Sequence, residues 1–182
     1  VIFMSGKSLN CLDLKTGKPV WQVEAPSGAA RTLVACDGCV VLRGSGLEIL
    51  DAATGKRLWQ KQAVPAMWGE DLFVIDGVVW PGMQAVRDAG ASGGRADDVR
   101  AIGYALKTGE ATKPVFAADL LSPEHHHRCY RNKATDRYLI SSMEGAEFLD
   151  LRGTNSRQNN FVRGSCKMGM VPCNGMLYVP PD

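Results

Sequence analysis

The stretch that decides the fold is Leu12-Asp13-Leu14-Lys15-Thr16-Gly17-Lys18-Pro19-Val20-Trp21. It returns 38 residues further on, counted from Asp13 to Asp51, as Leu50-Asp51-Ala52-Ala53-Thr54-Gly55-Lys56-Arg57-Leu58-Trp59. A weaker copy follows at Tyr104-Ala105-Leu106-Lys107-Thr108-Gly109-Glu110, and a degenerate one at Phe148-Leu149-Asp150-Leu151-Arg152-Gly153-Thr154. Because the position, the turn and the tryptophan recur together in the first two copies, we interpret the chain as an array of one repeated unit.

Each copy of this unit predicts a β-hairpin. The apolar residues before the aspartate alternate as they do in a strand. The aspartate can accept hydrogen bonds from backbone amides just ahead of it, which makes an Asx-type turn, and the glycine can take a positive φ at the tip. The chain then returns as a second strand that carries a large flat indole. The residues given this structural role are Asp13, Gly17, Trp21, Asp51, Gly55, Trp59 and Gly109.

A second repeated signal lies between the copies of the first. It is a two-residue turn, Asp37-Gly38, Asp76-Gly77 and Asn174-Gly175, and these pairs are preferred in tight antiparallel hairpins. The two signals together predict four-stranded units of roughly 40 residues, which are typical of propeller blades. The predicted fold class is therefore an all-β propeller with about four four-stranded blades present. Two chance hairpins in a β-sandwich are the alternative.

We expect one domain over residues 1–182, with partial blades at both ends. The blades are predicted at roughly 1–25, 30–63, 67–118, 128–163 and 164–182. In the third of these ranges the expected strands are 71–75, 78–80, 99–106 and 111–116, with a loop insertion at 84–98. In the fourth they are 129–131, 138–142, 146–151 and 161–163, with a polar loop at 152–160.

Composition places the chain among soluble globular proteins, with 45% hydrophobic and 22% charged residues in 182. The net charge of +2 argues neither for nor against a nucleic-acid partner, and we expect none because no run of basic residues stands out. No apolar stretch approaches the ~18 residues of a membrane span. Both ends fall in or next to strands, so we expect a fragment of a longer protein. Because an open arc exposes strand edges, the expected partners are the remaining blades, another protein or a second copy.

The unit Asp-x-x-Thr-Gly-Lys-x-x-Trp, at Asp13 to Trp21 and Asp51 to Trp59, resembles the tryptophan-docking repeat of bacterial quinoprotein-type propellers. These include the pyrroloquinoline quinone (PQQ) dehydrogenases and non-catalytic scaffold subunits of outer-membrane assembly machinery. The resemblance implies a ring of up to eight blades and a periplasmic or otherwise exported protein. It covers the first ~120 residues. Beyond them Lys113 stands where a third tryptophan is expected, and Gly153 comes one residue early.

The resemblance also implies what an enzyme of this kind needs. Such enzymes hold the quinone with two adjacent cysteines, a calcium-binding glutamate and asparagine, and a catalytic aspartate. The chain has no Cys-Cys pair, and Glu147, Asp150 and Asn155 do not lie in the family's motif, so no catalytic residue is assigned. We predict a binding or scaffold domain without a complete catalytic site. The alternative is part of an oxidoreductase that uses PQQ with calcium, or a metal.

One cluster suggests a metal site. If the segment is extended, His125, His127 and Cys129 point to one face, because strand side chains alternate. Imidazole and thiolate ligands suit zinc or copper. The alternative is a loop with solvated histidines and a buried cysteine. The nearby basic stretch could contact an anion together with Tyr130 and Tyr138, but strand alternation splits its charges between two faces, so we interpret it as a solvated edge. It consists of Arg128, Arg131, Lys133 and Arg137.

The six cysteines leave the redox compartment open. Cys36 and Cys39 flank a predicted turn, where they fit half a zinc ribbon, a redox pair, a disulfide or two core residues. Cys166 and Cys173 flank a later hairpin strand. Either can pair with Cys129 in an exported protein.

Overall fold

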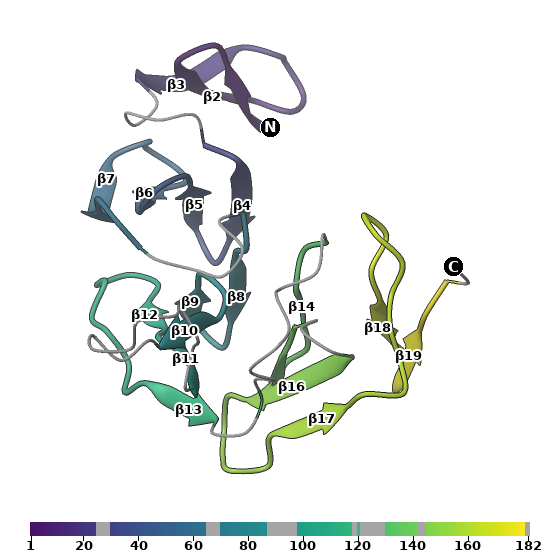
Figure 1. The fold of residues 1–182 in the computed structure, drawn as a ribbon. Helices are drawn as coiled ribbons and strands as arrows, with labels where there is room; N and C mark the ends of the chain where they lie inside the picture. Colours follow the sequence, from purple (N-terminus) through teal and green to yellow (C-terminus); the bar gives the residue numbers. More distant parts are fainter. Residues whose placement is uncertain are drawn as a thin grey trace.

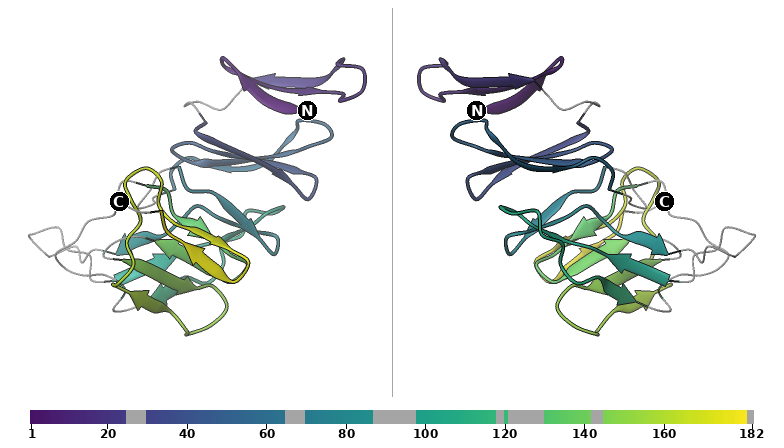
Figure 2. Two further views of the ribbon diagram at one scale, coloured as in Figure 1. Left: turned by 90° about the vertical axis from the view of Figure 1, so that its right-hand side faces the viewer. Right: turned by 90° about the vertical axis from the view of Figure 1, so that its left-hand side faces the viewer.

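A computed structural model describes residues 1–24, 30–64, 70–86, 98–117, 120, 130–141 and 145–180. Over these ranges the ordered elements are strands, with no helix among them. The sheets follow one another around an open arc, from the N-terminal sheet to a C-terminal hairpin (Figure 1). In the side views the first sheets are stacked above one another (Figure 2). The predicted all-β propeller is confirmed.

The sheets are antiparallel and their strands pair in chain order wherever the unit is regular. The first sheet contains β1 (Ile2–Ser5), β2 (Ser8–Leu12) and β3 (Pro19–Glu24). The second contains β4 (Thr32–Cys36), β5 (Cys39–Arg43), β6 (Leu47–Asp51) and β7 (Arg57–Lys61). A later four-stranded sheet contains β14 (Lys133–Ala134), β15 (Tyr138–Ser141), β16 (Ala146–Asp150) and β17 (Arg157–Asn159), and β18 (Val171–Cys173) pairs with β19 (Met176–Tyr178).

The unit between these sheets differs from the prediction, because it forms two sheets. One contains β8 (Phe73–Ile75), β9 (Val78–Trp80) and β12 (Tyr104–Ala105), and the other contains β10 (Gln84–Val86), β11 (Asp98–Ala101) and β13 (Val115–Ala117). The expected continuous strand 99–106 breaks at Ile102 and Gly103. A Cβ atom on Gly103 would lie 2.4 Å from Val78 Cγ1, so the chain passes the neighbouring strand too closely for a side chain.

The predicted insertion 84–98 also needs correction at its ends. Gln84 pairs with Arg100 and Val86 pairs with Asp98, so both ends of the insertion are strands. The change of direction follows Pro81, which has no backbone N–H, and Gly82, which has φ +95°. These two residues lead the chain out of β9 and into a second sheet. Residues 87–97 lie outside the described ranges.

Two strand predictions in the later four-stranded sheet were wrong. The returning strand is β17, where Phe148 pairs with Arg157, and not 161–163. Phe161 is fully exposed. An outer strand needs few apolar residues, so its polar sequence gave no hydrophobic signal. The first strand is β14, and Tyr130 and Arg131 do not belong to a strand, while residue 129 lies outside the described residues. Tyr130 instead packs against Ala146 and Met170.

The core lies between successive sheets. Leu9, Val40, Leu42 and Leu50 fill the space between the first and second sheets. The space between the second sheet and the β8–β9–β12 sheet is filled by Val41, Ile49, Leu72, Val79 and Leu106. The following space, toward the β14–β17 sheet, is filled by Trp80, Met83, Leu139 and Leu149. Both faces of an inner strand are therefore covered, which explains why Val40, Val41 and Leu42 are buried in succession.

Candidate functional site

The repeated turn has the same hydrogen bonds in its first two copies. Asp13 Oδ1 accepts hydrogen bonds from the Thr16 hydroxyl at 2.7 Å and the Thr16 amide at 2.8 Å, and Asp51 Oδ1 accepts them from Thr54 at the same distances. The threonine hydroxyl is the main reason why the pKa of each aspartate is lowered. These carboxylates hold their own turn and lie on its exposed side, so they are placed for structure.

The tryptophans join each sheet to the next. Trp21 Nε1 donates to the Ala52 carbonyl at 3.0 Å, and Trp59 Nε1 donates to the Leu106 carbonyl at 2.8 Å. Each indole lies on the turn glycine of the following sheet. A Cβ atom on Gly55 would lie 2.8 Å from the Trp21 ring, and one on Gly109 would lie 2.7 Å from the Trp59 ring. Tryptophan and glycine therefore form one inter-sheet contact.

At the fourth copy of the turn, a contact between charged groups takes the place of the contact between tryptophan and glycine. The tryptophan of the third copy would lie here, but Lys113 stands at its position and is exposed. The turn residue Arg152 instead donates from Nη2 to Asp76 Oδ2 at 2.6 Å, which links the β8–β9 hairpin to the later sheet. Arg137, just before β15 (Tyr138–Ser141), donates to both oxygens of the buried Asp150 in this turn, at 3.1 and 2.9 Å. This hydrogen-bonded guanidinium lowers the pKa of Asp150 to about 2.

We expect this carboxylate to make folding stability depend on acid pH. Its pKa is depressed in the folded state, so its contribution is present above the unfolded value near 4 and is lost as pH falls toward about 2. The half-exposed Arg137 reduces that contribution to roughly 1–2 kcal/mol. Urea titrations between pH 5 and 2 should show this loss in the wild type and not in Asp150→Asn. Asp136→Asn, at a position whose side chain is 81% exposed, is the matched control and should keep the wild-type slope.

A further copy of the turn lacks the aspartate and the threonine of the first two copies, with Ser165 and Met168 in their places. The amide of Gly169 donates to the Ser165 carbonyl at 2.9 Å, as Gly55 does to Asp51, and Gly169 has φ +71°. A Cβ atom on Gly169 would lie 2.6 Å from the Tyr130 ring. Tyr130 therefore covers this glycine as the tryptophans cover theirs. The remaining sequence signal is a glycine four residues after a small polar residue.

A polar network joins three sheets where β4, β8 and β14 begin. The Thr32 hydroxyl donates to the Glu70 carbonyl at 2.7 Å, and Arg131 donates to that same carbonyl and to Thr32 Oγ1. Asn132 Nδ2 donates to Asp71 Oδ2 at 2.5 Å, and both side chains are buried. Arg131 thus has partners inside the molecule, so the solvated-edge interpretation was wrong for it, whereas Arg137 is exposed and pairs with Asp150.

Each inner hairpin has one face that turns toward the next sheet along the chain, which we call the forward face. In β4–β5 it consists of Val34, Cys36, Cys39 and Val41, which pack against the core shared with the next unit. In β8–β9 it consists of Phe73, Ile75, Val78 and Trp80, which pack in the core shared with the β14–β17 sheet. Counted from the turn, the equivalent residues of β18–β19 are Val171, Cys173, Met176 and Tyr178.

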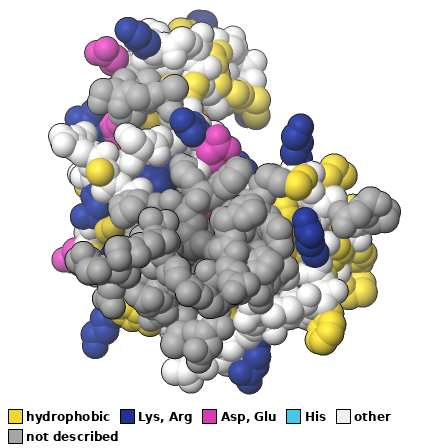
Figure 3. All heavy atoms as spheres, in the orientation of Figure 1, with side chains coloured by type: hydrophobic (Ala, Val, Ile, Leu, Met, Phe, Trp, Pro, Cys, Tyr) yellow, Lys and Arg dark blue, Asp and Glu magenta, His cyan; other side chains and the backbone are white. Residues whose placement is uncertain are grey.

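The forward face of β18–β19 is exposed. Val171, Met176 and Tyr178 are 51%, 57% and 48% exposed, and Cys173 is also exposed. Leu177, on the other face, packs against the core that contains Tyr130. Figure 3 shows apolar side chains along the right-hand edge, where Figure 1 places this hairpin. An apolar surface of this kind, in a position that is elsewhere a core position, is a candidate docking surface.

The cysteine predictions have separate outcomes. Cys36 and Cys39 face each other across the turn as free thiols in or against the core, so the disulfide alternative was wrong. Burial raises the pKa of both thiols. Cys173 is free and Cys166 is disulfide-bonded. His125, His127 and Cys129 lie outside the described residues, and within the described part no group of three or more acidic, histidine or cysteine side chains could hold a metal.

The described acids do not fit PQQ and calcium. Glu147 is buried and accepts hydrogen bonds from Ser141 and from the Gly145 amide, while Asp150 is held by Arg137. Asn155 donates to the Tyr138 hydroxyl. All three groups lie in the β14–β17 sheet, where each is engaged by neighbouring groups of that sheet. No catalytic step through a quinone follows from these residues.

The fold and the docked indoles define a propeller whose sheets are joined by tryptophan and glycine. The chain belongs to the family of the outer membrane protein assembly factor BamB, whose sequence profile matches residues 2–111. No curated protein matches the sequence. Over the part of the chain that the structure describes, no helix has the length and apolar character to cross a membrane.

Three solved structures are similar to the chain. BamB from Moraxella catarrhalis has 18% identity and a TM-score of 0.45, with 97% of this chain and 62% of that one covered. A europium-containing methanol dehydrogenase has 18% identity and a TM-score of 0.41, with 64% and 24% covered. The computationally designed Ika8 protein has 10% identity and a TM-score of 0.56, with 97% and 53% covered, and this likeness concerns the fold. The chain spans less than two thirds of the length of each.

Proposed function

We propose that the chain acts as a binding or scaffold domain that holds a protein partner on its sheet faces. The observation that carries the proposal is the exposed forward face of β18–β19. Equivalent faces in β4–β5 and β8–β9 are buried or half-buried against the core shared with the next unit. The description of the family as an outer membrane protein assembly factor supports a role in holding other proteins.

The partner that fits this face is another sheet of the same repeat. The forward face of β4–β5 is covered by apolar residues of the next unit such as Leu72, Val79 and Leu106. The first sheet has a comparable free surface, on which Val1, Phe3 and Val20 are exposed. A second copy can supply that surface in a head-to-tail contact, which pairs two different patches. In a longer polypeptide a further sheet of the same chain would take this place.

We therefore expect the 182-residue chain to self-associate, and sedimentation equilibrium in reducing buffer should show an average mass that rises with concentration. Met176→Lys places a charge on the forward face and Phe3→Lys on the opposite surface, so each should weaken association by about tenfold or more. Leu58→Lys, at an exposed position on β7, is the control and should leave association unchanged. A folded wild-type chain that stays monomeric at every concentration would contradict the proposal.

We also propose that the protein is exported. The disulfide at Cys166 supports this, because disulfides persist in oxidising compartments. Protein extracted from its native cells without reductant should show Cys166 protected from alkylation by iodoacetamide. The exposed thiol of Cys173 should be labelled in the native state. Peptide mass spectrometry reads out both, and equal native labelling of the two cysteines would reject export into an oxidising compartment.

A further inference from the structure

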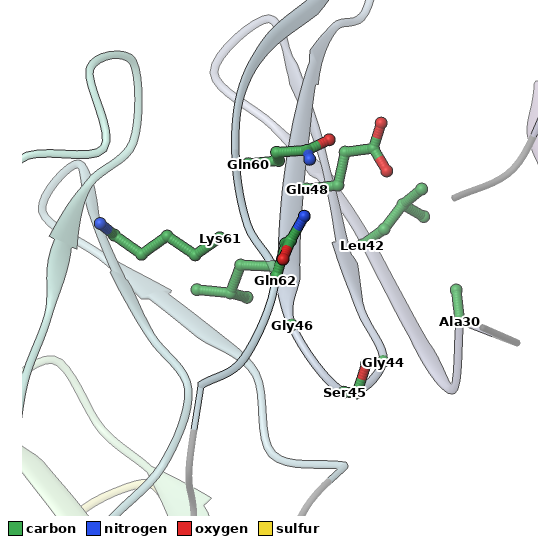
Figure 4. Close-up of a pocket in the computed structure, with 10 residues that line it drawn as sticks. Ala30, Leu42, Gly44, Ser45, Gly46, Glu48, Gln60, Lys61 and Gln62 are labelled. Atoms are coloured by element: carbon green, nitrogen blue, oxygen red, sulfur yellow. The ribbon is translucent and has the colours of Figure 1, made fainter. Parts of the chain in front are cut away.

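A cleft of about 330 Å³ lies at one end of the second sheet, beside the turn between β5 and β6. Leu42, Glu48 and Gln60 extend to one side of the sheet, while Lys61 extends to the other (Figure 4). The ammonium of Lys61 lies 4.9 Å from the centre of the Tyr104 ring, so it belongs to the neighbouring contact. The cleft volume is at the lower end of the range for small-molecule sites.

The carboxylate of Glu48 is the most unusual group in this lining. The side chain is 5% exposed, and Oε1 accepts a hydrogen bond from Arg57 Nε at 2.5 Å. Oε2 is buried and has no hydrogen-bond partner among the described residues. A buried acceptor without a donor costs on the order of 1–3 kcal/mol. The free oxygen therefore favours any molecule that can bring a donor to it.

The repeat itself shows how the same carboxylate is satisfied elsewhere. Gly46-Leu47-Glu48-Ile49-Leu50-Asp51 matches Gly145-Ala146-Glu147-Phe148-Leu149-Asp150 position by position. Glu147 receives the Ser141 hydroxyl at Oε2 and the Gly145 amide at Oε1, both at 3.0 Å. Ser141 faces Glu147 across the sheet, and Leu42 faces Glu48 in the same register. The second sheet thus has the same carboxylate, but Leu42 stands opposite it where the later sheet has the Ser141 hydroxyl, and Oε2 is left without a donor.

The neighbouring groups decide what kind of molecule fits. Arg57 already meets the charge of Glu48, so the free oxygen needs a donor and not a second cation. The amides of Gln60 and Gln62 and the hydroxyl of Ser45 can each donate and accept, as the hydroxyls of a sugar or polyol do. Leu42 and Ala30 add an apolar wall. We propose that this cleft binds a small neutral polyhydroxyl molecule through a hydroxyl that donates to Glu48 Oε2.

Isothermal titration of the folded chain with methyl β-D-glucopyranoside tests the proposal. We expect measurable binding, with glycerol as a weaker ligand. Glu48→Met removes the acceptor and Gln60→Ala removes the neighbouring amide, and each should weaken binding by about tenfold or more. Gln22→Ala is the matched control, because Gln22 has the equivalent position on β3 opposite Asn10 and lies outside the cleft.

Leu42→Ser gives a second, independent test, because a serine there copies Ser141 and can satisfy Glu48 from within the sheet. We expect it to weaken sugar binding while the carboxylate remains. Should this core substitution or Glu48→Met fail to fold, the exposed Gln60→Ala still decides the question. No binding to the wild type would mean that water alone meets Oε2, and would overturn the proposal. Wild-type affinity in Gln60→Ala, or displacement of the sugar by methylammonium, would overturn it as well. The experiment measures sugar binding and not the association of sheets, so this proposal and the proposed function can fail independently.

Discussion

Replacing Trp59 with alanine should lower the free energy of unfolding by about 3–5 kcal/mol. The indole lies on Gly109 of the next unit and donates to the Leu106 carbonyl at 2.8 Å, so its loss opens a cavity between two sheets and removes a hydrogen bond. Urea unfolding followed by circular dichroism measures the change, and an unchanged slope with denaturant would show that the unfolding transition stays comparable.

Two further variants separate the causes of this effect. Trp59→Phe keeps most of the flat apolar surface but loses the hydrogen bond, so we expect a cost of about 1–2 kcal/mol. Leu58→Ala changes an adjacent residue that is 42% exposed, and it should cost less than about 0.5 kcal/mol. A Trp59→Ala variant no less stable than Leu58→Ala would show that the indole does not join the sheets.

The regular part of the fold was predictable because its signals are local. In the second sheet the turn pair Asp37-Gly38 marks the β4–β5 hairpin, and the unit from Asp51 to Trp59 marks the β6–β7 hairpin. Periodicity and turn chemistry act within a few residues, so a single sequence contains them.

The irregular parts depend on contacts between distant residues. The break at Gly103 follows from its approach to Val78, and the burial of Tyr130 follows from a glycine 39 residues later, Gly169. Neither approach leaves a periodic pattern. Polar β17 pairs because β16 offers it an edge, although its own residues do not indicate a strand.

The candidate sites were accessible to sequence reasoning only in part. Aligning Asn174-Gly175 with Asp37-Gly38 would have shown that Met176 and Tyr178 occupy core positions, but their exposure is a structural finding. The contrast between Glu48 and Glu147 depends on which residue lies opposite in the sheet, Leu42 or Ser141. The register that brings these pairs together has to be known before the missing donor is noticed.

Gly55→Ala and Gly77→Ala form the sharpest matched pair in the chain, because both glycines have φ +72°. At Gly77 an added Cβ atom meets nothing within 4 Å. Gly77→Ala should therefore lower the free energy of unfolding only by the strain of an alanine in the left-handed conformation, about 1–2 kcal/mol. At Gly55 the same atom would lie 2.8 Å from the Trp21 ring, and the indole must move away from the turn. Overpacking of this kind destabilises the folded protein by a further roughly 1–3 kcal/mol.

We therefore expect Gly55→Ala to be less stable than Gly77→Ala by about 1–3 kcal/mol in urea unfolding at neutral pH. A Trp21→Ala background provides the coupling test, because without the indole the two glycine substitutions should cost the same. A double-mutant cycle then gives the interaction between Gly55 and Trp21 directly. Equal costs of the two substitutions in the wild-type background would mean that the indole tolerates a side chain at the turn. The repeated glycine would then serve the backbone of its own hairpin and not the junction between sheets.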